Sequence, residues 1–257
     1  MEMSSTMEFE IDARLLQRVL EVTSVVVKEP TLVFSEAGVS IVSFDAAKVA
    51  LVQLGLRKSE FEVYDVGEEK QKISFDVGLL ASYLRGAEGT TTLVVVKHKI
   101  DLMIPSKYGF KTFEVPLLGD VGTTRVPKIK LDSRCKLDLG GLRSVVRDGD
   151  KVAAEYCKFT VSNDDLNAEL KGEKGSASSM LEIGKGVIES QFTTKSKFVT
   201  TLTWLKDVLS VGTPFTNIAL FEFSEKLFPC KFTYQVSFDG HLMLYIAPID
   251  DKEVYPE

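Results

Sequence analysis

Histidine and cysteine side chains are common nucleophiles, general bases and metal ligands, and this chain has two histidines and three cysteines. The two histidines, His98 and His241, have no neighbouring residues at a metal-binding spacing. The three cysteines are Cys135, Cys157 and Cys230. They lie far apart and form no C-x-x-C pair, which favours buried or free thiols in a reducing compartment. No G-x-S-x-G elbow or complete phosphate-binding loop occurs. The sequence therefore predicts no catalytic residue, no metal and no cofactor, and a cysteine-dependent intracellular enzyme stays open as an alternative.

Basic residues offer another chemistry, the binding of phosphate. Arg14 and Arg18 lie one turn apart on a predicted helix, away from the centre of its apolar face, and Arg143 and Arg147 repeat that spacing in the second half. The net charge is −6 and the pI about 5.2, so nucleic acid should repel the chain as a whole. Any contact with phosphate therefore needs a local basic surface. Ordinary solvated helix faces would show the same arginine pattern.

The first half contains the elements that would position Arg14 and Arg18. Asp12 is placed to cap a helix whose apolar residues recur at helical spacing from Leu16 to Thr23. A second helix begins at Phe75-Asp76 and ends at Gly86, beside Arg85. Strands are expected at residues 31–34, 39–44, 49–56, 92–97, 100–104 and 108–118.

The second half repeats this order after a shift of about 126 residues. Leu137-Asp138 opens a helix that carries Arg143 and Arg147, and a second helix is expected at Val199–Ser210. Lys206 lies beside the apolar face of that second helix, which weakens it as a phosphate ligand. Strands are expected at residues 152–156, 158–162, 166–170, 217–223, 230–238 and 241–246.

The duplication predicts an α+β fold of two tandem similar domains. We expect an N-terminal domain at 1–118, a connector at 119–134 and a C-terminal domain with a short acidic tail at 135–257. A single β-barrel would also explain the number of strands, but the repeated Asp-capped helix argues against it. The N-terminus shows no signal-peptide pattern and no apolar run is long enough to span a membrane, so an intracellular location without membrane contact is expected.

Two stretches resemble the DNA sliding clamps of the proliferating cell nuclear antigen (PCNA) family, in an archaeal-like form. Residues 38–54, which end in Val-Ala-Leu-Val-Gln-Leu, are similar to the family's first-domain signature. Phe228-Pro229, followed by Gly240–Ile249, is similar to its closing G-H-L-x-Y-Y-L-A-P motif. With the duplicated pattern, the resemblance covers residues 8–249.

The resemblance implies a processivity factor, a trimeric ring of identical or related subunits with helices lining its channel and antiparallel sheets outside. The ring would hold double-stranded DNA independently of sequence, after a clamp loader has placed it there. It would tether a DNA polymerase, a flap endonuclease and a DNA ligase through short peptide motifs, in replication and repair. The basic residues expected to face DNA are Arg14, Arg18, Lys28, Arg85, Arg143, Arg147 and Lys151. A checkpoint-type clamp subunit is the alternative within the family.

The resemblance also implies two surfaces for proteins. The first, here called the client pocket, would accept partner peptides at Phe44, Lys48, Val49, Leu51, Leu118, Val126, Pro127, Phe228, Pro229, Ala247, Pro248 and Ile249. The second would join subunits by pairing residues 108–118 of one chain with residues 179–186 of the next, through Tyr108, Phe110, Phe113, Met180, Leu181 and Ile183. Two departures from the family bear on client preference. Phe44 stands where the family often has Met, and the connector is short of the family's usual acids and carries Arg125, Lys128 and Lys130.

Overall fold

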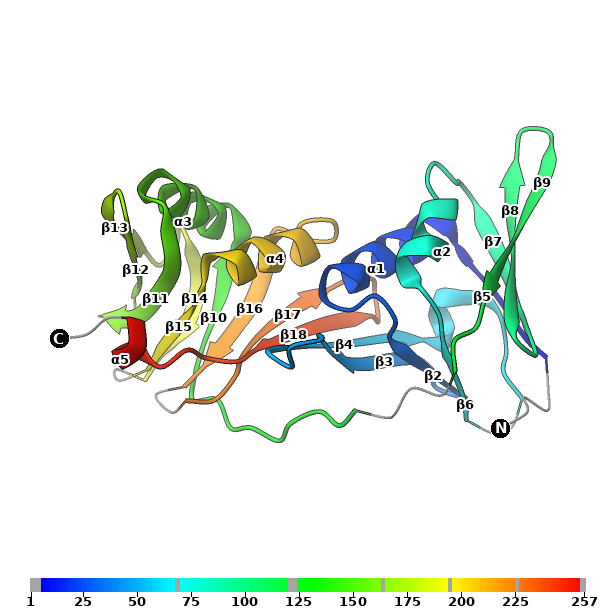
Figure 1. Ribbon diagram of the computed structural model, residues 1–257, viewed down its shortest axis with the longest axis horizontal. Helices are drawn as coiled ribbons and strands as arrows, with labels where there is room; N and C mark the ends of the chain where they lie inside the picture. The colour runs from blue at the N-terminus through cyan, green and yellow to red at the C-terminus, as the bar shows by residue number, and fades with distance from the viewer. Residues whose placement is uncertain are drawn as a thin grey trace. The chain divides into compact units, whose positions relative to one another are not determined.

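The chain forms two compact units, which we describe separately. The computed structural model describes residues 6–67, 70–119, 124–162, 165–193, 196–224 and 227–254 (Figure 1). The N-terminal unit contains the described residues up to Val126 together with Gln235–Leu242. The C-terminal unit contains the described residues of 127–234 and those from Met243 onward. The predicted α+β fold with a duplicated pattern is confirmed.

The N-terminal unit combines two antiparallel sheets with two helices. Its five-stranded sheet has the order β5-β1-β7-β8-β9, and four further strands have the order β4-β3-β2-β6. The elements are β1 Met7–Asp12, α1 Ala13–Val26, β2 Thr31–Ser35, β3 Gly38–Phe44, β4 Ala50–Arg57, the 3-10 helix η1 Lys58–Glu60, β5 Phe61–Asp65, β6 Gln71–Ser74, α2 Val77–Tyr83, β7 Thr90–Val96, β8 Lys99–Ser106 and β9 Gly109–Pro116.

The C-terminal unit repeats this plan. Its four-stranded sheet has the order β13-β12-β11-β15, and its other strands have the order β14-β10-β16-β17-β18. The elements are β10 Ser133–Asp138, α3 Leu139–Val152, β11 Ala154–Ser162, β12 Asp165–Gly172, β13 Gly175–Leu181, β14 Val187–Gln191, β15 Lys197–Thr201, α4 Leu202–Gly212, β16 Ile218–Phe223, β17 Cys230–Gln235, β18 His241–Ile246 and the short helix α5 Asp251–Val254.

Side-chain caps fix where the helices begin. Asp12 accepts a hydrogen bond from the Leu15 backbone N–H at 2.7 Å at the start of α1. Asp138 accepts bonds from Gly140 at 2.6 Å and Gly141 at 3.1 Å at the start of α3. The predicted Asp-capped helix therefore occurs in both units. Asp76 caps α2 and Thr201 caps α4 in the same way.

Strand pairing changes two predicted boundaries in the C-terminal unit. The helix expected from Val199 begins at Leu202, because residues 197–201 pair with β11 as strand β15. The strands expected at 152–156 and 158–162 are wrong as separate elements, since β11 runs without a break from Ala154 to Ser162. The pairing of β11 with β12 shifts register between Ala154 and Tyr156 and is regular from Tyr156 to Ser162.

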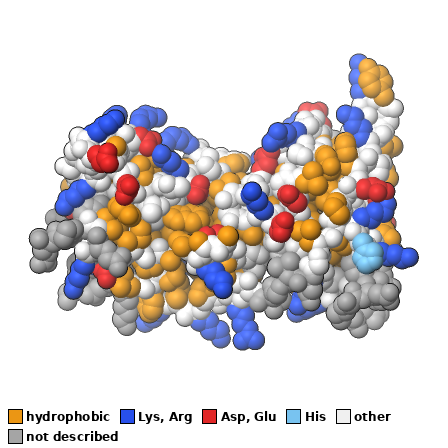
Figure 2. Space-filling view, in the orientation of Figure 1, with side chains coloured by type: hydrophobic (Ala, Val, Ile, Leu, Met, Phe, Trp, Pro, Cys, Tyr) orange, Lys and Arg blue, Asp and Glu red, His pale blue; other side chains and the backbone are white. Residues whose placement is uncertain are grey.

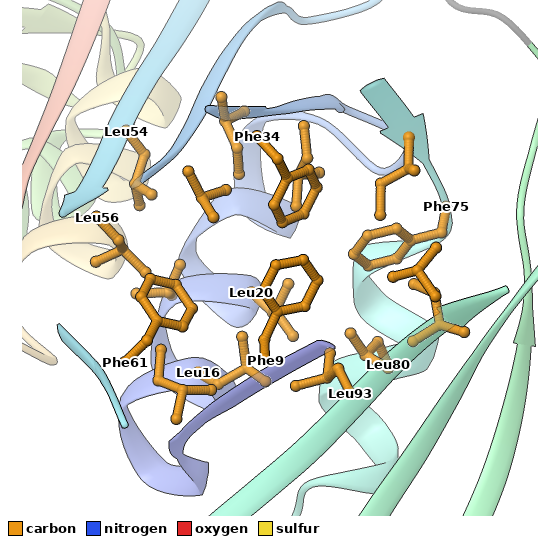
Figure 3. A pocket seen from close by; sticks show the side chains of 18 residues that line it. Phe9, Leu16, Leu20, Phe34, Leu54, Leu56, Phe61, Phe75, Leu80 and Leu93 are labelled. Atoms are coloured by element: carbon orange, nitrogen blue, oxygen red, sulfur yellow. The ribbon is translucent and has the colours of Figure 1, made fainter. Parts of the chain in front are cut away.

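The core of the N-terminal unit packs around a small cavity that apolar side chains line. Side chains from α1, α2 and the strands of both sheets line a volume of about 50 Å³, and Phe9 stacks on Phe34 with ring centroids 4.8 Å apart (Figure 3). No polar side chain lines this cavity, so it offers no group for catalysis or for orienting a polar ligand. We assign it to the packing of the core.

Candidate nucleic-acid and partner interfaces

Basic side chains stand exposed on the helices of the N-terminal unit. Arg14 and Arg18 are both exposed on α1, which packs beside α2. The Arg14 guanidinium pairs with Glu88, which follows α2, and the Arg18 Nε donates a hydrogen bond to the Arg14 carbonyl at 3.2 Å. These residues line an open hollow of about 430 Å³ together with Gln17, Gly86 and Ala87. The two arginines therefore lie at one polar depression of the surface.

The other two predicted basic residues of this unit lie at the helix ends. Lys28 follows α1 and Arg85 follows α2, and both side chains are exposed. The Lys28 carbonyl accepts a hydrogen bond from the Val77 N–H at 3.0 Å, which ties the end of α1 to the start of α2. Neither Lys28 nor Arg85 has an ion-pair partner among the described residues.

The C-terminal unit presents a corresponding set on α3. Arg143 and Arg147 are exposed, and neither forms an ion pair with any described residue. Lys151, at the last turn of α3, has its Nζ 2.8 Å from the Asp148 carboxylate. Figure 2 shows Lys and Arg side chains over the helices of each unit, with Asp and Glu side chains between them.

Lys206 is a basic residue that sequence reasoning discounted. Its side chain on α4 is exposed rather than buried beside the apolar face, and its Nζ lies 2.7 Å from the Asp150 carboxylate at the end of α3. The packing of α3 against α4 brings Lys206 to Asp150, the residue before Lys151. Helical periodicity could not predict this contact, because it distinguishes the apolar and polar faces of one helix and does not show which residues of another helix lie nearby.

The residues predicted to join subunits lie on two edge strands, one in each unit. On and beside β9, Tyr108 is 91% and Phe110 is 71% exposed, whereas Phe113 is half-buried and stacks on Tyr83 at 4.4 Å. On and beside β13, Met180 is 58% and Ile183 is 47% exposed. Within their sheets β9 pairs only with β8, and β13 only with β12. Each strand therefore leaves one row of backbone groups available for pairing.

Leu181 differs from the expectation for this interface. Its side chain is only 6% exposed and lies against Gly141 and Gly186 of its own unit. The reason is the strand alternation, which turns Leu181 inward and leaves its neighbour Met180 outward.

The N-terminal residues of the predicted client pocket are mixed in exposure. Phe44, at the end of β3, is 39% exposed and Leu118 is 37% exposed. Lys48 is exposed with a left-handed φ of 57°, and Val49 and Val126 are half-buried. Leu51 differs from the expectation because it is 1% exposed, inside the core of its unit. A side chain this buried cannot form an open wall of the pocket.

The C-terminal residues of the client pocket are all half-buried: Pro127, Phe228, Pro229, Ala247, Pro248 and Ile249. The Ile249 N–H donates a hydrogen bond to the Val199 carbonyl at 3.0 Å, which fixes the segment after β18 to its own unit. Because the predicted residues divide between the two units, the pocket as a whole stays a prediction.

The cysteines are poorly suited to nucleophilic chemistry. All three are buried, with exposures of 0–1%. Burial raises the pKa of Cys135 to about 12, and it also raises the pKa of Cys157 and of Cys230. A buried thiol that stays protonated is a poor nucleophile, which argues against the cysteine-dependent enzyme. The described residues include no group of ligand side chains arranged for a metal ion.

Within the part of the chain that the structure describes, every helix is too short or too polar to cross a bilayer.

Comparisons with known proteins cover nearly the whole chain. Residues 7–104 match the family model for the N-terminal domain of proliferating cell nuclear antigen. The DNA polymerase sliding clamp of Pyrococcus abyssi is 24% identical over 251 residues, which cover 94% of this chain and 98% of that protein. DNA polymerase sliding clamp 2 of Sulfolobus acidocaldarius is 22% identical over 242 residues, or 93% and 97% of the two chains.

Solved structures share the fold at lower identity. Proliferating cell nuclear antigen from Entamoeba histolytica superposes with a TM-score of 0.84 at 15% identity, over 95% of this chain and 98% of that one. The PCNA of A. fulgidus, solved with the C-terminal region of FEN-1, gives 0.81 at 19% identity over the same shares. A PCNA2–PCNA3 complex from Sulfolobus tokodaii gives 0.80 at 17%, over 94% and 98%. Residues 7–104 thus match the N-terminal domain of proliferating cell nuclear antigen, and along nearly its whole length the chain is similar to DNA polymerase sliding clamps and shares the fold of solved PCNA structures.

Proposed function

We propose that this chain is one subunit of a DNA sliding clamp, a ring that encircles duplex DNA and tethers replication and repair proteins to it. The observation that carries the proposal is the duplicated Asp-capped helix, α1 and α3, which presents exposed arginines in both units of a chain with a net charge of −6. An acidic protein with exposed arginine on equivalent helices has a local surface for phosphate. The sliding-clamp names of its relatives support the same function.

The basic helices would hold DNA without fixing its position. Arg14, Arg18, Arg143 and Arg147 would attract phosphates, which repeat identically along a duplex and carry no sequence information. Without hydrogen bonds to base edges, all positions along the duplex have nearly the same free energy. The ring would therefore slide.

Ring closure would use the two edge strands. We propose that β9 of one subunit pairs with β13 of the next, because each leaves backbone donors and acceptors unpaired within its sheet. This contact joins different surfaces, so it must close through a rotation, and two domains per chain suit a trimer. The Sulfolobus tokodaii structure holds two PCNA subunits, which supports partners that are identical or related chains.

The clamp would act on its clients by tethering and without catalysis of its own, inside the cell. Short peptides of a polymerase, a flap nuclease or a ligase would bind at the client pocket, as the C-terminal region of FEN-1 is bound by the A. fulgidus protein. Linking a client to DNA raises its local concentration at the substrate, which increases the length copied or processed per binding event. A clamp loader would open the ring to place it on DNA.

The first test is native mass by light scattering across a concentration series of the purified chain. A stable species of three times 28.5 kDa supports a homotrimeric ring. A monomer at every concentration indicates that related subunits are required, and the measurement is then repeated with those subunits.

The second test is primer extension on a circular single-stranded template with a replicative polymerase and clamp loader. We expect longer products when the closed ring is added. The double variant Arg143→Ala, Arg147→Ala should form the same ring and stimulate less. A closed ring that leaves product length unchanged would contradict the function in replication and favour a checkpoint-type clamp.

A further inference from the structure

The segment of residues 124–132, which we call the basic connector, lies outside the sheets and helices of both units. It forms no helix or strand, and Figure 1 draws its C-terminal part as a plain trace leading into β10. Its Lys128 and Lys130 are exposed, and neither forms an ion pair or hydrogen bond with any described residue. Arg125 precedes them in the sequence and is exposed as well. The connector therefore carries positive charge that the described chain leaves uncompensated.

Asp132 holds the end of the basic connector in place. Its carboxylate accepts hydrogen bonds from Ser196 at 3.1 Å and Ser224 at 3.2 Å, and its carbonyl accepts one from the Thr193 hydroxyl at 3.1 Å. The one acid of the segment is thus engaged by hydroxyl groups instead of the lysines. An anchored end also lowers the entropy cost of ordering the connector against a ligand.

Side-chain exposure alternates along the connector. Lys128 and Lys130 are exposed, whereas Ile129 and Leu131 are half-buried. This period of two is that of an extended backbone, which places both ammonium groups on one side. From residue 124 to 131 the described backbone makes no hydrogen bond. A peptide bound along the connector as an extended strand could pair with its backbone N–H and C=O groups. The same peptide would face the ammonium groups of Lys128 and Lys130.

We propose that the basic connector selects client peptides with carboxylates at alternate positions, such as Glu-x-Glu, next to their apolar anchor. The inference rests on the proposed function, because it concerns peptides that bind a clamp. Opposite charges facing each other across paired strands attract, and like charges repel. Two exposed pairs of this kind change affinity by roughly threefold to tenfold at low salt, and by less as salt screens them.

The test uses fluorescent peptides that share one anchor, the C-terminal region of A. fulgidus FEN-1. To either end of this peptide we add Glu-Ala-Glu, Ala-Ala-Ala or Lys-Ala-Lys, and dissociation constants are measured by anisotropy with the full chain at low and high salt. We expect the acidic peptide to bind most tightly and the basic one least, with the difference shrinking in high salt.

Charge-reversal variants assign the effect to the lysines. Lys128→Glu and Lys130→Glu should each reduce the preference for the acidic peptide, and the double variant should reverse it. Lys174→Glu is the matched control, since Lys174 is an exposed lysine of the same unit on the β12–β13 turn. That variant should keep the wild-type order of affinities.

Each other result has its own meaning. If the peptides bind equally well, the inference is wrong while the client surface stands. If none of them binds, the proposed client function fails for this anchor and the charge preference fails with it. If the double variant weakens binding to duplex DNA and leaves the peptide order unchanged, the lysines serve phosphate contacts and the inference is overturned.

Discussion

Glu88 is the acidic neighbour of Arg14 and should weaken the attraction of α1 for DNA. An exposed ion pair contributes little to stability, but its carboxylate lowers the local positive potential that a phosphate would meet. We expect Glu88→Gln to tighten binding to duplex DNA by roughly twofold to fivefold at low salt, and Arg14→Gln to weaken it. Anisotropy of a labelled duplex across a salt series measures both.

The control for Glu88 is Glu36→Gln, which removes an exposed acid on the β2–β3 turn of the same unit. It should change affinity much less than Glu88→Gln. Equal effects of the two variants would mean that net charge decides the affinity and that the position on the helices does not.

The cysteines give a second prediction for single residues. With a pKa of about 12, Cys135 is a thiolate in only about one molecule in ten thousand at pH 8, and burial also shields it from reagents. We expect no thiol to react with Ellman's reagent in the native protein and all three to react in urea. Rapid labelling of one thiol in the native protein would support the alternative hypothesis of a cysteine-dependent enzyme.

Single residues were predicted well where their own helix decides exposure. Arg14 and Arg143 lie beside apolar faces that the sequence shows, and both are exposed. Leu51 and Leu181 were predicted to lie at protein interfaces, but Leu51 is buried in the core of its unit and strand alternation turns Leu181 inward. The ion pair of Lys206 with Asp150 was not predictable from α4 alone, because α3 supplies the carboxylate.

At the scale of elements, the end of α4 depends on Gly212. A Cβ at this position would lie 2.3 Å from the ring of Tyr234, which is fully buried and donates a hydrogen bond to the Val208 carbonyl at 3.0 Å. The ring cannot move without losing that bond. We expect Gly212→Ala to lower the free energy of unfolding by about 1–3 kcal/mol, despite the better helix propensity of Ala, as measured by urea denaturation.

The control is Gly55→Ala on β4, where an added Cβ would meet no atom within 4 Å. This substitution should leave stability nearly unchanged. If Gly212→Ala is equally harmless, Tyr234 is held less firmly than its burial indicates.

The short helix α5 is tied to β11 and β15 by one carboxylate. Lys197 Nζ lies 2.8 Å and Lys158 Nζ 3.2 Å from the oxygens of Asp251. Burial alone would raise the pKa of Asp251, but the hydrogen bonds and charges of Lys197 and Lys158 together outweigh burial and lower it. A lowered carboxyl pKa stabilises the fold at pH values above the unfolded-state pKa, and this contribution is lost as pH falls through the folded-state pKa.

We therefore expect Asp251→Asn to cost a few tenths to about 1 kcal/mol at pH 7, after allowance for solvent screening. The difference from wild type should shrink as the pH falls below about 4, the usual range of an Asp carboxyl. Urea denaturation at several pH values measures it. A difference that is constant with pH would mean that the pairs with Lys158 and Lys197 do not stabilise α5.

The helices were the most predictable elements, because Asp12 and Asp138 show where α1 and α3 begin. The strands β5 and β14 were not predicted at all. Each is a short edge partner of β1 or β10, and such partners owe their conformation to backbone pairing that is absent from their own sequences. The start of α4 was misplaced for a related reason, since Val199 pairs with Lys158 as a strand residue.

At the scale of the whole molecule, the exposed aromatic residues beside β9 should decide assembly. A charged group at Phe110, now 71% exposed, would be buried without a partner if β9 pairs with the next subunit. We expect Phe110→Asp to shift the native mass from trimer to monomer in light scattering. Phe238→Asp is the matched control, because Phe238 is 90% exposed and lies outside both edge strands.

A variant Phe110→Asp that keeps its trimeric mass would show that the ring closes elsewhere or that closure does not bury residue 110.

The duplicated fold was predictable because the sequence of this one chain contains both copies of the repeated pattern. The client pocket and the ring were predicted through the resemblance, since the pocket would combine residues from distant segments and the ring would combine residues from separate subunits.

The unpaired edges of β9 and β13 also link the stability of this protein to its abundance. A partner that binds only the folded chain stabilises it by mass action, and the partner proposed for the edges of β9 and β13 is another folded subunit. If the ring forms as proposed, the midpoint of thermal unfolding should rise with protein concentration. A cell that contains this protein at low concentration would then hold it closer to unfolding than a concentrated purified sample does.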